Sequence, residues 1–149
     1  MALPKLNTQT YELEVPSTDE KIKYRPFLVK EEKILLQAQE GGEGEMMDAV
    51  ADVVTSCTFG KLDVNKLPSF DLEYIFLKIR SKAVGEKVTL NLPFPGDENV
   101  KVPTKVDLSK VEVHMDEEHT NKIDLTDQVS VVMRYPTICL LYTSPSPRD

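Results

Sequence analysis

The chain lacks the features that would place it in a membrane or send it through one. No apolar run approaches the roughly 20 residues that a helix needs to cross a bilayer. The first residues, MALPK, have neither the basic region nor the apolar stretch and cleavage site of a signal peptide. A content of 40% hydrophobic and 29% charged residues is typical of a soluble globular domain. We therefore expect no membrane partner.

The common signatures of enzymes are missing as well. The sequence has no Gly-rich phosphate loop, no CxxC pair and no Gly-x-Ser-x-Gly motif. Residues 41–44 (GGEG) are acidic and follow a predicted helix. A phosphate cradle instead leads into a helix N-terminus beside a cation, so this run predicts a linker. We expect no enzymatic activity and no cofactor.

Histidine is scarce, and its two copies raise one alternative. His114 and His119 flank Asp116, Glu117 and Glu118, which would suit a small metal-dependent hydrolase. On a strand followed by a turn, however, the two imidazoles need not converge, and such acids usually form a solvated loop. The spacing therefore predicts no metal site.

Positive charge is in short supply. Eighteen Lys and Arg stand against 25 Asp and Glu, which gives a net charge of -7 and an isoelectric point near 4.9. General binding to a phosphate backbone needs clustered cations, so a nucleic-acid-associated role is a weaker alternative. The charge favours a protein partner and no nucleic acid.

Cysteine is rare, and one of its two positions lies in an unusual tail. Residues 139–149 (CLLYTSPSPRD) look like one translated frame of a sequencing adapter. This interpretation makes residues 1–138 a single native domain with its own C-terminus missing, and 139–149 a non-native tail. Cys57 is then the one native cysteine, and its place in an apolar helical pattern predicts a small buried side chain.

The periodicity of the remaining residues predicts an α+β fold. Residues 10–25 alternate as a β-hairpin around a turn at 16–20, and residues 30–40, 45–58 and 70–83 have helical spacing. Turn residues then separate four alternating stretches that predict an antiparallel β-meander with one face on the core. Residues 123–125 are either a further short strand or an extended approach to the last one. The four predicted strands are 87–92, 100–102, 106–113 and 129–135.

The predicted third helix is apolar on two faces. One face carries Leu72, Ile75, Phe76 and Ile79, which we expect at the centre of the core. The acids of its first turn, Asp71 and Glu73, are explained by the helix dipole. A helix with so much apolar surface can use its second face to hold a partner. The candidate protein-binding residues on that face are Phe70, Tyr74 and Leu77.

Three stretches resemble the baseplate hub and tail-assembly protein family of T-even-type contractile phages. They are residues 24–33 (YRPFLVKEEK), 70–86 (FDLEYIFLKIRSKAVGE) and 131–137 (VVMRYPT). The central stretch is the specific one, because an amphipathic helix in general would not reproduce that order of residues. The resemblance covers about residues 9–138, and family members are usually longer.

This resemblance implies a non-enzymatic role in contractile tail morphogenesis. The chain would be a component of the baseplate hub, or a factor that helps the hub to assemble, and its partners would be other baseplate or tail proteins. It would act in the host cytoplasm during assembly, and a hub component would end in the virion baseplate. A permanent component should bury a large apolar surface in its interface, whereas a transient factor should bury less.

Overall fold

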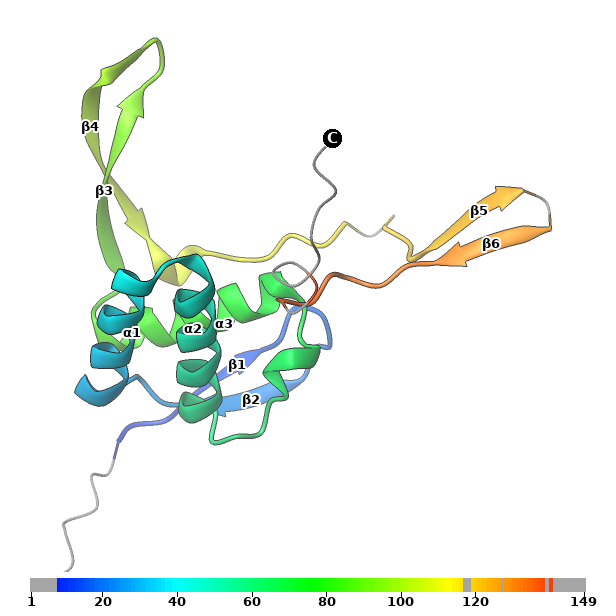
Figure 1. Cartoon of the computed structure of the whole chain (residues 1–149), viewed down its shortest axis with the longest axis horizontal. Helices are drawn as coiled ribbons and strands as arrows, with labels where there is room; N and C mark the ends of the chain where they lie inside the picture. Colours follow the sequence, from blue (N-terminus) through cyan, green and yellow to red (C-terminus); the bar gives the residue numbers. More distant parts are fainter. Residues whose placement is uncertain (1–7, 117–118, 127, 139, 141–149) are drawn as a thin grey trace, which may run out of the picture.

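The computed structural model describes residues 8–116, 119–126, 128–138 and 140. It confirms the predicted α+β class: an N-terminal hairpin, three helices and then antiparallel strand pairs (Figure 1). In chain order the elements are β1 (Tyr11–Glu14), β2 (Lys21–Tyr24), α1 (Val29–Gly41), α2 (Glu43–Cys57), the 3-10 helix η1 (Val64–Lys66), α3 (Ser69–Ala83), β3 (Lys87–Phe94), β4 (Asp97–Asp107), the 3-10 helix η2 (Leu108–Lys110), β5 (Lys122–Thr126) and β6 (Val129–Val132).

The β1–β2 hairpin forms where alternation predicts it. Tyr11 pairs with Tyr24, and Leu13 pairs with Ile22. Ile22 and Tyr24 are buried, while Lys21 and Lys23 are exposed, because successive side chains of a strand point to opposite faces. The turn is closed by a hydrogen bond of 2.9 Å from the Val15 amide to the Glu20 carbonyl.

The connection between α1 and α2 is shorter than the sequence suggests. We predicted a linker at residues 41–44, but α1 runs through Gly41 and α2 already begins at Glu43. Gly42 alone joins them, with a φ of 111° that residues with a side chain rarely adopt. One glycine in this conformation is enough to set the two helices side by side (Figure 1).

Helix α3 is the centre of the core, as its sequence predicts. Leu72, Ile75 and Ile79 are 0% exposed, whereas Phe76, expected beside them, is only partly buried. Cys57 is also fully buried, as predicted, and burial raises the pKa of its thiol to about 11. The buried cluster draws on the hairpin, α2, η1 and α3: Val15, Ile22, Tyr24, Val50, Val53, Val54, Cys57, Val64, Leu67, Leu72, Ile75 and Ile79.

The strands that follow α3 pair in antiparallel fashion but do not lie on this core. β3 pairs with β4, and β5 pairs with β6, as two separate two-stranded sheets. Our expectation of one sheet face on the core is therefore wrong, because β1–β2, α2, η1 and α3 already fill it. The strand predicted at 106–113 is also wrong beyond Asp107. There the carboxylate of Asp107 accepts a hydrogen bond of 3.1 Å from the Ser109 amide, and η2 begins.

The stretch after β6 returns to the start of α3. The Ser69 amide donates a 3.3 Å hydrogen bond to the Pro136 carbonyl, and Pro68 and Thr137 form an antiparallel bridge. Ile138 then packs against the core. The strand predicted at 129–135 accordingly ends at Val132, while residues 123–125 prove to be part of a strand, β5.

Two hairpins project from the helical part of the molecule. We call residues 87–107 the β3–β4 arm and residues 122–132 the β5–β6 arm. They leave the molecule in different directions, the first beside α1 and the second at the opposite end (Figure 1). At the base of the β3–β4 arm, the Leu108 amide donates a 2.7 Å hydrogen bond to the Glu86 carbonyl, and Lys78 donates to the Ser109 carbonyl at 2.9 Å.

Candidate functional site

The face of α3 that we predicted to bind a partner is partly covered by the chain itself. Phe70, Tyr74 and Leu77 are each partly buried. The Phe70 and Tyr135 rings form a T-shaped contact at a centroid distance of 5.0 Å. The Lys78 ammonium lies 5.0 Å from the centre of the Tyr74 ring, and burial raises the pKa of the Tyr74 hydroxyl. This face stays a prediction, with less free surface than the sequence suggests.

The projecting arms are a surface that sequence reasoning missed. In the β3–β4 arm, Leu92 is paired with Val102, and Leu90 lies two residues away on the same face of the strand. These side chains are 42–44% exposed, and Phe94 and Val100 nearer the tip are 48–54% exposed. Alternation does signal this apolar face. What the sequence alone does not show is that the core leaves it uncovered.

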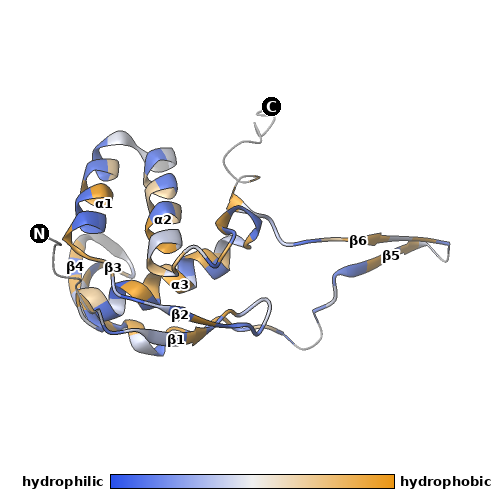
Figure 2. Cartoon of the chain, turned by 90° about the horizontal axis from the view of Figure 1, so that it is seen from below, coloured by the Kyte–Doolittle hydropathy of each residue, from blue (hydrophilic) through white to orange (hydrophobic). Residues whose placement is uncertain are grey.

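The β5–β6 arm has the same two-faced character. Ile123 pairs with Val131, and Leu125 and Val129 continue the apolar face toward the turn, where the register shifts. These four side chains are 37–63% exposed. Figure 2 shows hydrophobic and hydrophilic residues alternating along the arm, well away from the packed helices. An apolar face of this kind, outside any core, is a candidate interaction surface.

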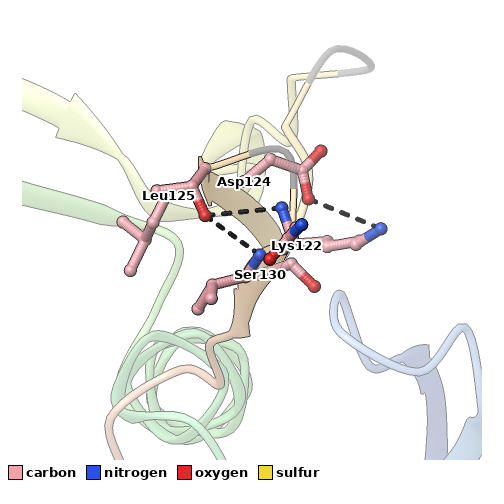
Figure 3. A pocket seen from close by; sticks show the side chains of 7 residues that line it. Lys122, Asp124, Leu125 and Ser130 are labelled. Carbon is pink, nitrogen blue, oxygen red and sulfur yellow. Dashed lines mark hydrogen bonds and ion pairs between the residues drawn. The ribbon is translucent and has the colours of Figure 1, made fainter.

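The polar face of the β5–β6 arm carries an open hollow. Lys122, Asp124, Thr126, Gln128 and Ser130 are among the residues that line it. The Lys122 ammonium lies 3.5 Å from the Asp124 carboxylate, and Leu125 points away from this ion pair (Figure 3). The hollow is polar and open to solvent, so it adds no enclosed pocket to the arm.

The stretch at residues 24–33 is tied together by a buried ion pair. The Arg25 guanidinium lies 2.9 Å from one carboxylate oxygen of Glu31, and the other oxygen accepts a 2.8 Å hydrogen bond from the Leu28 amide. Burial alone would raise the pKa of Glu31, but the hydrogen bonds from Arg25 and Leu28 outweigh it and lower that pKa. The Arg25 amide also donates to the Cys57 carbonyl at 3.0 Å. The pair therefore fixes the end of β2 against the start of α1, and the backbone bond of Arg25 joins the same point to the end of α2.

Asp71 has a role that its sequence position did not reveal. We assigned it to the helix dipole, but it is 0% exposed and accepts hydrogen bonds from both the Ser17 amide, at 3.2 Å, and the Ser17 hydroxyl. It thus ties the β1–β2 turn to the first turn of α3. Burial raises the pKa of this carboxyl, and the bonds from Ser17 oppose the shift. No local pattern links two residues so far apart in sequence.

The two histidines lie on the surface. His114 and His119 are both exposed, and the His119 ring stacks on Tyr135 at a centroid distance of 5.8 Å. Glu117 and Glu118, which we considered with them, lie outside the described residues. Within the part of the chain that the structure describes, no three His, Cys, Asp or Glu residues are grouped to hold a metal ion. The same part contains no helix long and apolar enough to cross a membrane.

Comparison with known proteins gives one match. The model of a family described as T4 bacteriophage base plate protein matches residues 8–144. No curated protein and no solved structure matches the chain. The matched residues include both arms, the helical core and the stretch that returns to α3.

Proposed function

The chain belongs to the T4 bacteriophage base plate protein family, and from this premise we propose that it is a component of the baseplate hub or a factor that assembles the hub. Membership supports a structural role at the phage baseplate, with other tail proteins as the partners. In this proposal the chain acts by protein–protein binding during contractile tail morphogenesis and carries out no catalysis. It is made and used in the host cytoplasm, and a hub component would remain in the virion.

The observation that carries this proposal is the pair of uncovered arms. Each is a two-stranded sheet with an exposed apolar face, and among the described residues none of the hydrophobic side chains packed on the core comes from an arm. An isolated two-stranded hairpin is at best marginally stable in water, so a second layer on its apolar face would stabilise it. In a baseplate, the neighbouring proteins can supply such a layer.

Whether the chain stays in the particle separates the two forms of the proposal. The test is to delete the gene from its phage, examine the tails by electron microscopy and search purified wild-type virions for the chain by mass spectrometry. Hubless baseplates together with the chain in virions indicate a hub component. Hubless baseplates with no chain in virions indicate an assembly factor. Normal baseplates without the gene would overturn the proposal.

The α3 face provides a second, narrower test. If Tyr74 is a binding anchor with Leu77 and Phe70 beside it, then Tyr74→Ala should cost about 2 kcal/mol or more of hub-partner binding. The double change of His114 and His119 to Ala is the control, because both side chains are exposed and we assign them no part in assembly. Complementation of the gene deletion measures both variants. Normal plaque yield from the Tyr74 variant, with none from the double-His variant, would reverse both assignments.

A further inference from the structure

The two arms differ in how the outer edges of their strands are protected. In the β3–β4 arm, the hydrogen bond from the Leu108 amide to the Glu86 carbonyl fixes which pairs of the ladder are hydrogen-bonded. Such pairs alternate with non-hydrogen-bonded pairs, so Pro93 and Pro103 both stand at non-hydrogen-bonded positions with their backbone nitrogens facing outward. Proline has no N–H to donate. Each outer edge of this arm therefore lacks a donor where a third strand would pair.

The β5–β6 arm has an edge without this protection. The Met133 amide donates a 2.7 Å hydrogen bond to the Asn121 carbonyl, which fixes the alternation of this ladder. It follows that Ser130 and Val132 direct their amides and carbonyls away from β5. We call these backbone groups of Ser130 and Val132 the β6 edge. Among the described residues, no third strand pairs with it.

The outer edge of β5, by contrast, is blunted. The Lys122 amide points outward and already donates to the Thr120 hydroxyl at 3.2 Å. The same edge carries the charged side chains of Lys122 and Asp124, and the register shifts after Asp124. Charges and bulges of this kind keep strands from pairing. Residues 128–133 (QVSVVM), which contain β6, have neither charge nor proline, so the β6 edge is the one of these outer edges that is open.

The β6 edge fits a second copy of itself. When two antiparallel β6 strands are related by a two-fold axis at Val131, Ser130 of each copy lies across from Val132 of the other, and both gain backbone partners. Val131 then faces its own counterpart, a β-branched pair that suits a sheet. Arg134 lies across from Gln128, so no like charges meet along the seam. Any other antiparallel register leaves Ser130 or Val132 facing residues outside β6.

We propose that two copies of the chain join through their β6 edges, so that their two β5–β6 arms form one four-stranded sheet with the β6 strands at its centre. The apolar faces of the two arms, each with Ile123, Val129 and Val131, then lie on the same side of this sheet. A lone hairpin is marginal in water, and added strands that share an apolar face stabilise it. Because the arm projects clear of the helices, the two helical parts lie at opposite ends of the sheet (Figures 1 and 2). This inference goes beyond the proposed function and does not depend on it.

A proline on the β6 edge tests the proposal. Val132→Pro removes an outward amide and no bond within the arm, because Val132 stands at a non-hydrogen-bonded position. Thr89→Pro is the matched control, since Thr89 is exposed and faces outward on β3, whose edge Pro93 already interrupts. Circular dichroism melts that match wild type show that the variants are folded.

Sedimentation velocity of the full chain, at about 1 to 500 µM, is the measurement, since so short a seam is expected to bind weakly. Wild type and Thr89→Pro should form dimers as the concentration rises. The dissociation constant of Val132→Pro should be at least about tenfold higher, because each copy loses one hydrogen bond of the seam.

Two charged variants test the register. Val131→Lys and Val131→Glu each place like charges directly across the seam, so each variant alone should dimerise about fivefold more weakly than wild type. An equimolar mixture sets opposite charges against each other and should recover dimers of one copy of each. Hydrogen exchange adds a readout that packing of the apolar faces would not give. The Ser130 and Val132 amides should exchange more slowly as the concentration rises, whereas the Asp124 amide, on the outer edge of β5, should not change.

Three results would overturn the inference. A wild type that is monomeric at every concentration would do so, as expected if the β6 edge pairs only with a strand of another protein, and it would leave the hub role to be tested by gene deletion. Undiminished association of Val132→Pro would show that the contact lies elsewhere. A mixture of the charged variants that associates no better than either alone would show that Val131 does not face its counterpart.

Discussion

Replacing Arg25 by Met should destabilise the fold far more than a surface ion pair would. The side chains of Arg25 and Glu31 are only 14% and 7% exposed, and their charged atoms lie 2.9 Å apart. Without Arg25, Glu31 stays buried beside the Leu28 amide with no positive charge. Breaking a buried pair in this way typically costs about 3–5 kcal/mol of the free energy of unfolding.

The double variant tests whether the cost comes from the stranded carboxylate. Glu31→Gln removes the charge but keeps an oxygen that can accept from the Leu28 amide. Arg25→Met combined with Glu31→Gln should therefore cost less than the sum of the two single changes, by about 1–3 kcal/mol. Urea unfolding followed by circular dichroism measures all three variants.

The pH dependence should change sign between wild type and the Arg25 variant. The folded-state pKa of Glu31 is lowered, so the pair stabilises wild type above the usual pKa of a Glu, and this stabilisation is lost as pH falls through the lowered value. In Arg25→Met, burial instead raises that pKa, and protonation relieves the cost of the buried charge. The stability difference between the two proteins should thus shrink as pH falls from about 7 to 3.

Lys23 and Glu12 provide the matched control for this argument. They form an ion pair at 3.4 Å on the same hairpin, but their side chains are 64% and 65% exposed. Lys23→Met should cost at most about 1 kcal/mol, because solvent screens exposed pairs. If Arg25→Met costs no more than Lys23→Met, or if the double variant shows strict additivity, the buried pair does not hold the hairpin to the helices.

Three further outcomes are expected. Ile75→Ala should lower the free energy of unfolding by about 2–5 kcal/mol in urea titrations. Phe76→Ala, at a partly buried site, should lower it by less than the roughly 3–5 kcal/mol of a fully buried ring. A larger loss for Phe76→Ala than for Ile75→Ala would contradict the placement of Ile75 at the centre of the core. Asp71→Asn should stabilise the fold near neutral pH and flatten its pH dependence, because the raised folded-state pKa means that stability is fully present below the unfolded-state pKa and is lost as pH rises through the folded-state value. The Ser17→Ala variant, which removes the hydroxyl donor and leaves the buried carboxylate with the amide of residue 17 alone, should be destabilised instead. Deleting residues 139–149 should change the free energy of unfolding in urea titrations by no more than about 0.5 kcal/mol. Unfolding on deletion would contradict the interpretation of these residues as a non-native tail.

Periodicity predicts the parts of this fold that pack on themselves. The three helices and the β1–β2 hairpin lie within a few residues of their predicted bounds, because their apolar faces are filled by one another. The burial of Cys57 follows from its place in the helical pattern of α2. At these sites local pattern and tertiary packing point the same way.

Periodicity does not predict which apolar faces stay uncovered once the core has formed. Leu92 and Val102 alternate with polar residues like any half-buried pair, yet both lie outside the core cluster and are exposed. An alternating pattern states that a face is apolar but not what covers it. Asp71 shows the complementary limit: its partner Ser17 comes from a distant turn, and only the assembled fold brings the two together.

The position of the core in the chain also bears on the order of folding. The buried cluster runs from Val15 to Ile79, so all of it precedes Lys87, the first residue of an arm. On a ribosome that adds about 5–20 residues per second, all residues of the cluster are synthesised some seconds before β6. The helical part can therefore fold first and receive its exposed strands afterwards. Mutations in the arms should accordingly alter what the chain associates with, while leaving its folding yield during synthesis unchanged.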